Sequence, residues 1–134
     1  MCLAVFISSD QPLPFVAWDE GEPAFNVVPL SEHEEIVRRQ FSLAHTVYAG
    51  AHTGCSCGFR SDDENPSAAT RSRAELLKYI EQAAASGPVE VFVCWEGEWG
   101  ESPRIRAQRP FASLPGGHDW LEELTLTCIP GLAT

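Results

Sequence analysis

The strongest constraint on the fold is a helical pattern that ends immediately before a run of β-branched residues. Ser72 and Glu75 match the pattern of a capping box, in which two side chains accept hydrogen bonds from backbone N–H groups at the start of a helix. Gly87 and Pro88 end the element, and the alternating apolar run at 89–95 is typical of a central strand. The apolar residues at helical spacing between these signals are Leu76, Leu77, Ile80, Ala83 and Ala84. This order predicts a helix packed on a sheet.

A second, shorter helix is predicted at 31–41. Ser31 and Glu34 again match the capping box, and glutamates in the first turn suit the positive end of a helix dipole. Arg38 and Arg39 lie near the opposite end, where positive charge is favoured.

The remaining regular segments are short, rich in β-branched and aromatic residues, and bounded by turn residues, as strands are. They lie at 2–8, 15–18, 25–28, 45–50, 104–108 and 124–129. The polar, acidic segment 60–69 is predicted to be an exposed loop. We therefore expect one α+β domain, residues 1–134, with a single mainly antiparallel or mixed sheet and two helices packed on one face.

Composition limits the possible partners. The chain of 134 residues has a formal net charge of −10 and only nine Lys and Arg. Nucleic acid and anionic membranes are poor partners for such a surface, whereas a basic protein could be attracted to it. The opening "MCLAVFIS" lacks the basic start of a secretory signal, and no apolar run is long enough to span a membrane. We expect a cytoplasmic protein whose five cysteines are reduced.

The stretch "HTGCSCGF" (52–59) carries the most distinctive chemistry. Glycines at 50, 54 and 58 allow tight turns, and Cys55 and Cys57 point to the same side if the backbone is extended. The leading hypothesis is a thiophilic metal site, with zinc held by Cys55, Cys57 and His52. The other residues that could complete such a site are His45, Cys2, Cys94 and Cys128.

Three alternatives to metal binding are open for this stretch. Cys55 or Cys57 could be a reactive thiolate in a redox protein or cysteine-nucleophile enzyme, assisted by His52. "GCSCG" also matches Gly-x-Ser-x-Gly with Ser56 as nucleophile, but the residues that follow cannot open the required helix. Finally, the sulfurs could simply be buried as small apolar groups in a structural or protein-interaction domain.

The beginning of the chain raises a separate possibility. "MCLAVF" is similar to the opening of the Asn-Arg-Asp-Glu family, proteins that look like N-terminal-nucleophile hydrolases. That resemblance implies removal of Met1 and a nucleophilic Cys2 with its own α-amine as base. The stretch that names the family is absent, and "WDEGEPAF" stands instead. Otherwise Cys2 is the first buried residue of the first strand.

A longer resemblance spans most of the chain. The initial Met-Cys, the Gly-Cys-x-Cys-Gly-Phe motif within "YAGAHTGCSCGF", and "VEVFVCWEGE" together resemble small uncharacterised bacterial proteins of about this size. This resemblance implies an intact single domain and brings no known activity.

Overall fold

Six strands form one sheet in the computed structural model, which describes residues 2–132. The elements, in chain order, are β1 (Leu3–Ser9), β2 (Phe25–Pro29), the 3-10 helix η1 (Glu32–Gln40), β3 (His45–Ala51), the 3-10 helix η2 (Ser56–Arg60), α1 (Pro66–Ala84), β4 (Val89–Trp95), β5 (Ile105–Gln108), the 3-10 helix η3 (Phe111–Ser113) and β6 (Thr125–Ile129). The prediction of an α+β fold with a single mixed sheet is confirmed.

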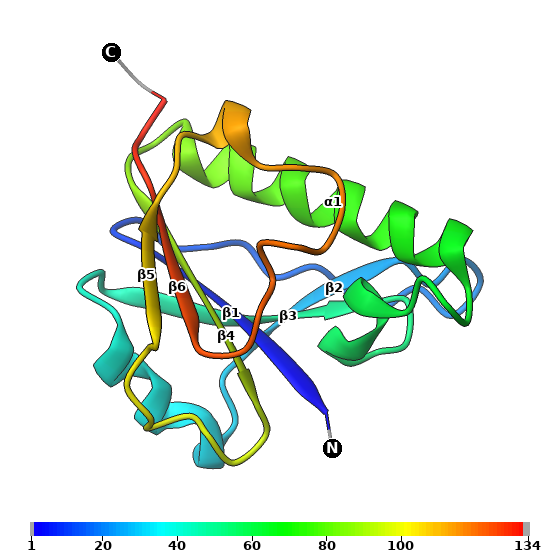
Figure 1. The fold of residues 1–134 in the computed structure, drawn as a ribbon, viewed down its shortest axis with the longest axis horizontal. Coiled ribbons are helices and arrows are strands. Elements are labelled where there is room, and N and C mark those ends of the chain that lie inside the picture. Colours follow the sequence, from blue (N-terminus) through cyan, green and yellow to red (C-terminus); the bar gives the residue numbers. More distant parts are fainter. Residues whose placement is uncertain (1, 133–134) are drawn as a thin grey trace.

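The strand order is β2-β3-β1-β4-β6-β5, so β1 and β4 occupy the middle of the sheet (Figure 1). All neighbouring pairs are antiparallel except β5 and β6, which are parallel. The central strand β1 is buried along its whole length. Its nearly continuous apolar sequence is explained by this position, because both faces of the sheet are covered.

The two predicted helices lie on opposite faces of the sheet, not on one face. Side chains alternate across a strand, so Val5 packs toward α1 while the adjacent Phe6 packs toward η1. Val37 of η1 belongs to the same buried cluster as Phe6 and Phe92. Figure 1 shows α1 along one side of the sheet and η1, in cyan, on the other. Within residues 2–132, no helix is both long and apolar enough to cross a membrane.

Helix α1 begins earlier than the sequence pattern predicted. Asn65 is the N-cap, its side chain accepting a hydrogen bond from the amide of Ala68, and Pro66 occupies the first turn. The predicted cap residue Ser72 is instead buried in the body of the helix. The exposed loop predicted at 60–69 is therefore shorter, because its Asn-Pro step starts the helix.

Two other predictions need correction. Residues 15–18 do not form a strand; only Val16 makes an isolated bridge, to Val27 of β2. The helix predicted at 31–41 is a 3-10 helix, although Ser31 and Glu34 do form the expected capping box. The predictions for 45–50, 89–95, 104–108 and 124–129 agree with β3, β4, β5 and β6 to within a residue.

Candidate functional site: a three-cysteine group at the start of β1

The candidate site forms where strands β1 and β3 separate. Their pairing stops at Val5 and Ala49, although both strands continue beyond this pair. The hydroxyl of Ser56 joins the two residues, accepting from the Val5 amide over 2.9 Å and donating to the Ala49 carbonyl over 2.6 Å. The amide of Ser56 donates in turn to the Tyr48 hydroxyl over 3.0 Å. Ser56 therefore holds η2 in the opening between the two strands.

Beyond this opening, η2 takes the place of β3 as the neighbour of β1. The amide of Leu3 donates to the sulfur of Cys57 over 3.2 Å. Cys2 comes immediately before β1, and its carbonyl accepts from the Glu96 amide at the end of β4 over 2.8 Å. As a result, the sulfur atoms of Cys2, Cys55 and Cys57 all lie within 4.8 Å of one another.

The backbone shape of this loop depends on two glycines. Gly54 has a φ of +85°, a left-handed conformation that favours glycine. Gly58 is packed so closely that an added Cβ would lie 2.8 Å from both the Ala51 Cβ and the Thr53 hydroxyl oxygen. The loop can therefore bring Cys55 and Cys57 against β1 only with these residues in place.

Thr53 links several parts of the loop through its hydroxyl. That hydroxyl donates to the carbonyl of Cys55 over 2.9 Å and accepts from the amide of Gly58 over 3.0 Å. It also lies 3.5 Å from the sulfur of Cys55. Thr53 thus fixes the turn and supplies a polar neighbour to the thiol.

The surroundings of Cys55 and Cys57 shift their pKa values in opposite directions. Burial would raise the pKa of Cys55, but hydrogen bonds from the Thr53 hydroxyl and from the amide and thiol of Cys57 lower it below its ordinary value. Burial raises the pKa of Cys57 to about 11, opposed by the Leu3 amide and reinforced by the hydrogen bond to Cys55. Cys55 is therefore the thiol of this pair that ionises first.

His52, the third predicted ligand, is not part of the cysteine group. Its Nδ1 lies 3.0 Å from the Ser72 hydroxyl oxygen and its Nε2 lies 3.4 Å from the Ser61 hydroxyl oxygen. Its amide also donates to Ser72, whose hydroxyl donates to the Ala24 carbonyl. The ring nitrogens of His52 are thus directed at serines, and the residue connects β3 to α1.

The other candidate residues lie elsewhere. His45 is exposed at the far end of β3, opposite Ser9. Cys94 is buried on the η1 face, where burial raises its pKa to about 12. Cys128 lies near Glu90, with its thiol 3.7 Å from that carboxylate. Cys2 is the candidate that the fold brings to Cys55 and Cys57.

Ser56 is not placed as a nucleophile. It is fully buried, and its hydroxyl is engaged by both β1 and β3. It is the first residue of a 3-10 helix of five residues, not the start of the long helix that the Gly-x-Ser-x-Gly arrangement requires. Ser56 therefore has a structural role, and its match to the motif does not indicate a nucleophile.

A hollow of about 360 Å³ opens beside the cysteine group. Cys57 forms part of its wall, with Leu3 and Trp95 as apolar neighbours and Arg60 and Glu64 as charged ones. All three cysteines are only partly buried. Sequence patterns gave no indication of Arg60 or Glu64, since nothing in the chain marks them as neighbours of Cys57 before the fold is known.

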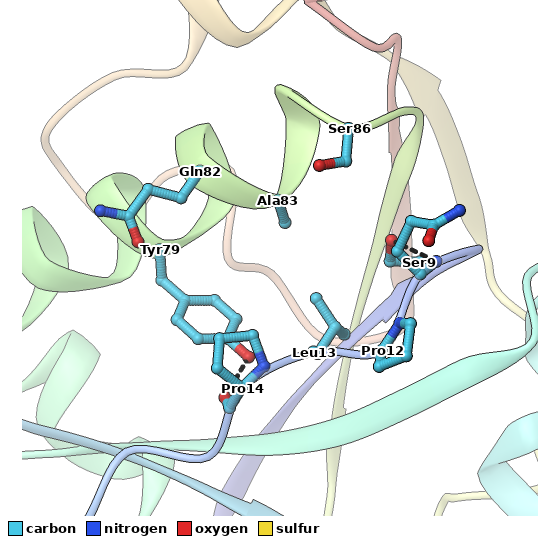
Figure 2. A pocket seen from close by; sticks show the side chains of 9 residues that line it. Ser9, Pro12, Leu13, Pro14, Tyr79, Gln82, Ala83 and Ser86 are labelled. Carbon is cyan, nitrogen blue, oxygen red and sulfur yellow. Dashed lines mark hydrogen bonds between the residues drawn. The ribbon is translucent and has the colours of Figure 1, made fainter.

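A second hollow lies between α1 and the segment that follows β1 (Figure 2). It measures about 150 Å³ and has no charged side chain or thiol among its lining residues. The Tyr79 hydroxyl, which points into this region, donates to the carbonyl of Pro14 over 2.7 Å. This contact ties the segment to the helix, and the hollow offers little chemistry beyond it.

The chain was also compared with known proteins. No family model matches it, and neither a curated protein nor a solved structure is significantly similar to it. The three-cysteine group itself therefore carries the functional argument, and it could hold a metal ion.

Proposed function

We propose that Cys2, Cys55 and Cys57 bind a thiophilic metal ion, with zinc as the first candidate. One observation carries the proposal: the fold gathers three sulfur ligands within 4.8 Å from two segments that are distant in the sequence. Two thiolates on one tetrahedral zinc, each at about 2.3 Å, are roughly 3.8 Å apart. The group therefore needs only a small contraction to accept such an ion.

The donor set supports a soft ion over a hard one. Three thiolates suit zinc or monovalent copper, whereas magnesium and calcium select oxygen ligands. No histidine, aspartate or glutamate of residues 2–132 joins the group. A tetrahedral ion would therefore keep one position for a ligand from solvent, as ions with three protein ligands do.

An ion at this position would have a clear structural effect. It would join the start of β1 to η2, segments that already meet through the bond between Leu3 and Cys57, 54 positions apart in the sequence. Binding to the folded state alone stabilises that state, by about 2.7 kcal/mol when the free ion is at 100 times its Kd. We expect the ion to stabilise the position of η2 in the opening between β1 and β3.

Elemental analysis of protein purified without chelator tests this proposal. We expect close to one thiophilic ion per chain, lost when Cys2, Cys55 or Cys57 is changed to serine. Cys128→Ser is the matched control, since that thiol lies near Glu90 on another part of the sheet. Metal-free wild-type protein that also fails to take up added zinc or cobalt would sink the proposal.

A second candidate function, disulfide exchange, is favoured by the opposite pKa shifts of Cys55 and Cys57. The Cys55 thiolate would attack a small disulfide and release one thiol, and Cys2 would then displace the second as it loses its proton. The products are two small thiols and a Cys2–Cys55 disulfide. We favour Cys2 as partner because a bridge within Cys-x-Cys is cramped. Peptide mapping after incubation with hydroxyethyl disulfide tests this, and an unbridged protein would rule it out.

A further inference from the structure

The hollow beside Cys57 has features of a small-molecule site. Its volume of about 360 Å³ lies within the range typical of ligand pockets. The Leu3 and Trp95 side chains provide an apolar wall, which belongs to the same cluster as the core under α1. A ligand that approached Cys57 from solvent through this hollow would therefore contact both apolar and polar groups.

Two opposite charges line the hollow without neutralising each other. Neither the Arg60 guanidinium nor the Glu64 carboxylate has an ion-pair partner among residues 2–132, and neither side chain makes a hydrogen bond there. Arg71 and Arg73, by contrast, both pair with acids. Arg60 and Glu64 are thus free to bind a ligand that carries both a negative and a positive group.

We infer that this hollow binds a small amino-acid thiol, whose sulfur completes the coordination of an ion held by the three cysteines. The inference rests on the proposed metal site. Arg60 would bind the ligand carboxylate and Glu64 its ammonium group, while the soft ion accepts a fourth sulfur. As the sulfur–metal bond forms, the ligand S–H bond breaks and its proton passes to solvent, so no oxidant or reductant is needed.

Protein loaded with Co²⁺ provides the test, because sulfur ligands give cobalt characteristic charge-transfer and visible bands. The probes are 3-mercaptopropionate, which has a thiol and a carboxylate, and cysteamine, which has a thiol and an ammonium group. Each is titrated into wild-type protein and into Arg60→Gln and Glu64→Gln. Arg106→Gln and Glu81→Gln are matched controls with the same charge changes. Arg106 lies in β5 on the opposite side of the sheet, and Glu81 lies near the end of α1.

The expected result is a crossed pattern. Arg60→Gln should weaken the binding of 3-mercaptopropionate by about tenfold and leave the binding of cysteamine unchanged or tighter. Glu64→Gln should weaken the binding of cysteamine by about tenfold and leave that of 3-mercaptopropionate unchanged or tighter. Neither control should move either Kd by more than about twofold. If both probes bind the cobalt protein equally well in all variants, the hollow does not select these groups, and the inference fails while the metal site stands. If no sulfur-to-cobalt band appears before any thiol is added, the metal site and this inference both fail.

Discussion

The amide nitrogen of Leu3 lies 3.2 Å from the sulfur of Cys57 and donates a hydrogen bond to it. In an ordinary sheet this amide would be directed at a carbonyl of the adjacent strand. Here β3 has moved away, and the 3-10 helix η2 presents a sulfur in its place. The same exchange brings Cys55 and Cys57 to Cys2, so the candidate site exists because one strand pair ends early.

Ser56 should be essential to this arrangement. Changing Ser56 to alanine leaves the amide of Val5 and the carbonyl of Ala49 without their shared partner in a buried region. We expect a loss of about 2–4 kcal/mol in the free energy of unfolding, measured in urea, because each unsatisfied buried group costs about 1–3 kcal/mol. Ser67→Ala, at an exposed position in the first turn of α1, should change stability by less than about 1 kcal/mol. Equal effects of the two substitutions would contradict this role for Ser56.

A side chain at position 58 should destabilise the loop that carries Cys55 and Cys57. In Gly58→Ala the new Cβ would lie 2.8 Å from both Ala51 and Thr53, so η2 must shift away from β3. We expect a loss of about 1–3 kcal/mol in stability and weaker metal binding in a cobalt titration. Gly117→Ala meets nothing within 4 Å and should be near neutral. A Gly58→Ala protein with wild-type stability and cobalt affinity would show that the loop can form without this close packing.

Much of the sheet could be predicted from the sequence because its strands are bounded by proline and glycine and carry β-branched residues. The face of the sheet that each helix covers could not be predicted, because the continuous apolar run of β1 does not distinguish one face from the other. Asn65 and Pro66 were missed as the start of α1 because Ser72 and Glu75 offer a second capping pattern inside the helix. Local patterns compete in this way, and tertiary packing decides between them.

The site shows the same division between local and long-range information. Cys55 and Cys57 are close in sequence, and together with the neighbouring glycines and His52 they suggested a thiol site. The partnership with Cys2 depends on how β1 and β3 separate, and the direction of His52 depends on where α1 places Ser72. Neither relationship has a local signature in the sequence. For this reason the sequence offered several candidates for the third metal ligand and could not choose among them.

His52 should be dispensable for metal binding. His52→Ala removes the contacts of the ring with the Ser72 and Ser61 hydroxyls, neither of which belongs to the cysteine group. We expect cobalt or zinc affinity within about threefold of wild type and a loss of about 1 kcal/mol in stability. A loss of metal binding as complete as that in Cys55→Ser would mean that His52 rotates to become a ligand.

The ion pair between Arg73 and Asp62 should make stability depend on pH at the acid end. Arg73 is buried, and both of its terminal nitrogens donate to the Asp62 carboxylate, over 2.7 and 2.8 Å. These hydrogen bonds lower the pKa of Asp62 below its ordinary value. The stabilisation is therefore fully present above the unfolded-state pKa of about 3.9 and is lost as pH falls through the lower folded-state pKa.

Asp62→Asn tests this link in urea unfolding experiments between about pH 2 and pH 7. The variant should be less stable than wild type at neutral pH, and the difference should shrink as acid protonates Asp62 in the wild type. Asp63→Asn, at the neighbouring exposed position, is the control and should follow the wild-type curve. A difference between Asp62→Asn and wild type that stays constant down to pH 2 would show that Asp62 does not titrate in this range.

Among Cys55, Cys57 and Cys94, Cys55 should be the first to react with an alkylating agent in the metal-free protein. The pKa of Cys55 is lowered by its hydrogen bonds, whereas burial raises those of Cys57 and Cys94 to about 11 and about 12. Because the thiolate is the nucleophile, near pH 7 the ionised fraction is largest at Cys55 within this set. Timed iodoacetamide labelling with peptide mapping should therefore show early modification of Cys55, and Thr53→Val should slow it by removing the hydroxyl that lies 3.5 Å from that sulfur and lowers the pKa of the thiol. Burial and the nearby Glu90 carboxylate raise the pKa of Cys128, so its labelling should be slow. Added zinc should protect Cys55 and leave the labelling of Cys128 unchanged, because only the first of these thiols lies in the three-cysteine group. Faster labelling of Cys57 than of Cys55 would reverse the assigned order of ionisation and, with it, the direction of the disulfide exchange.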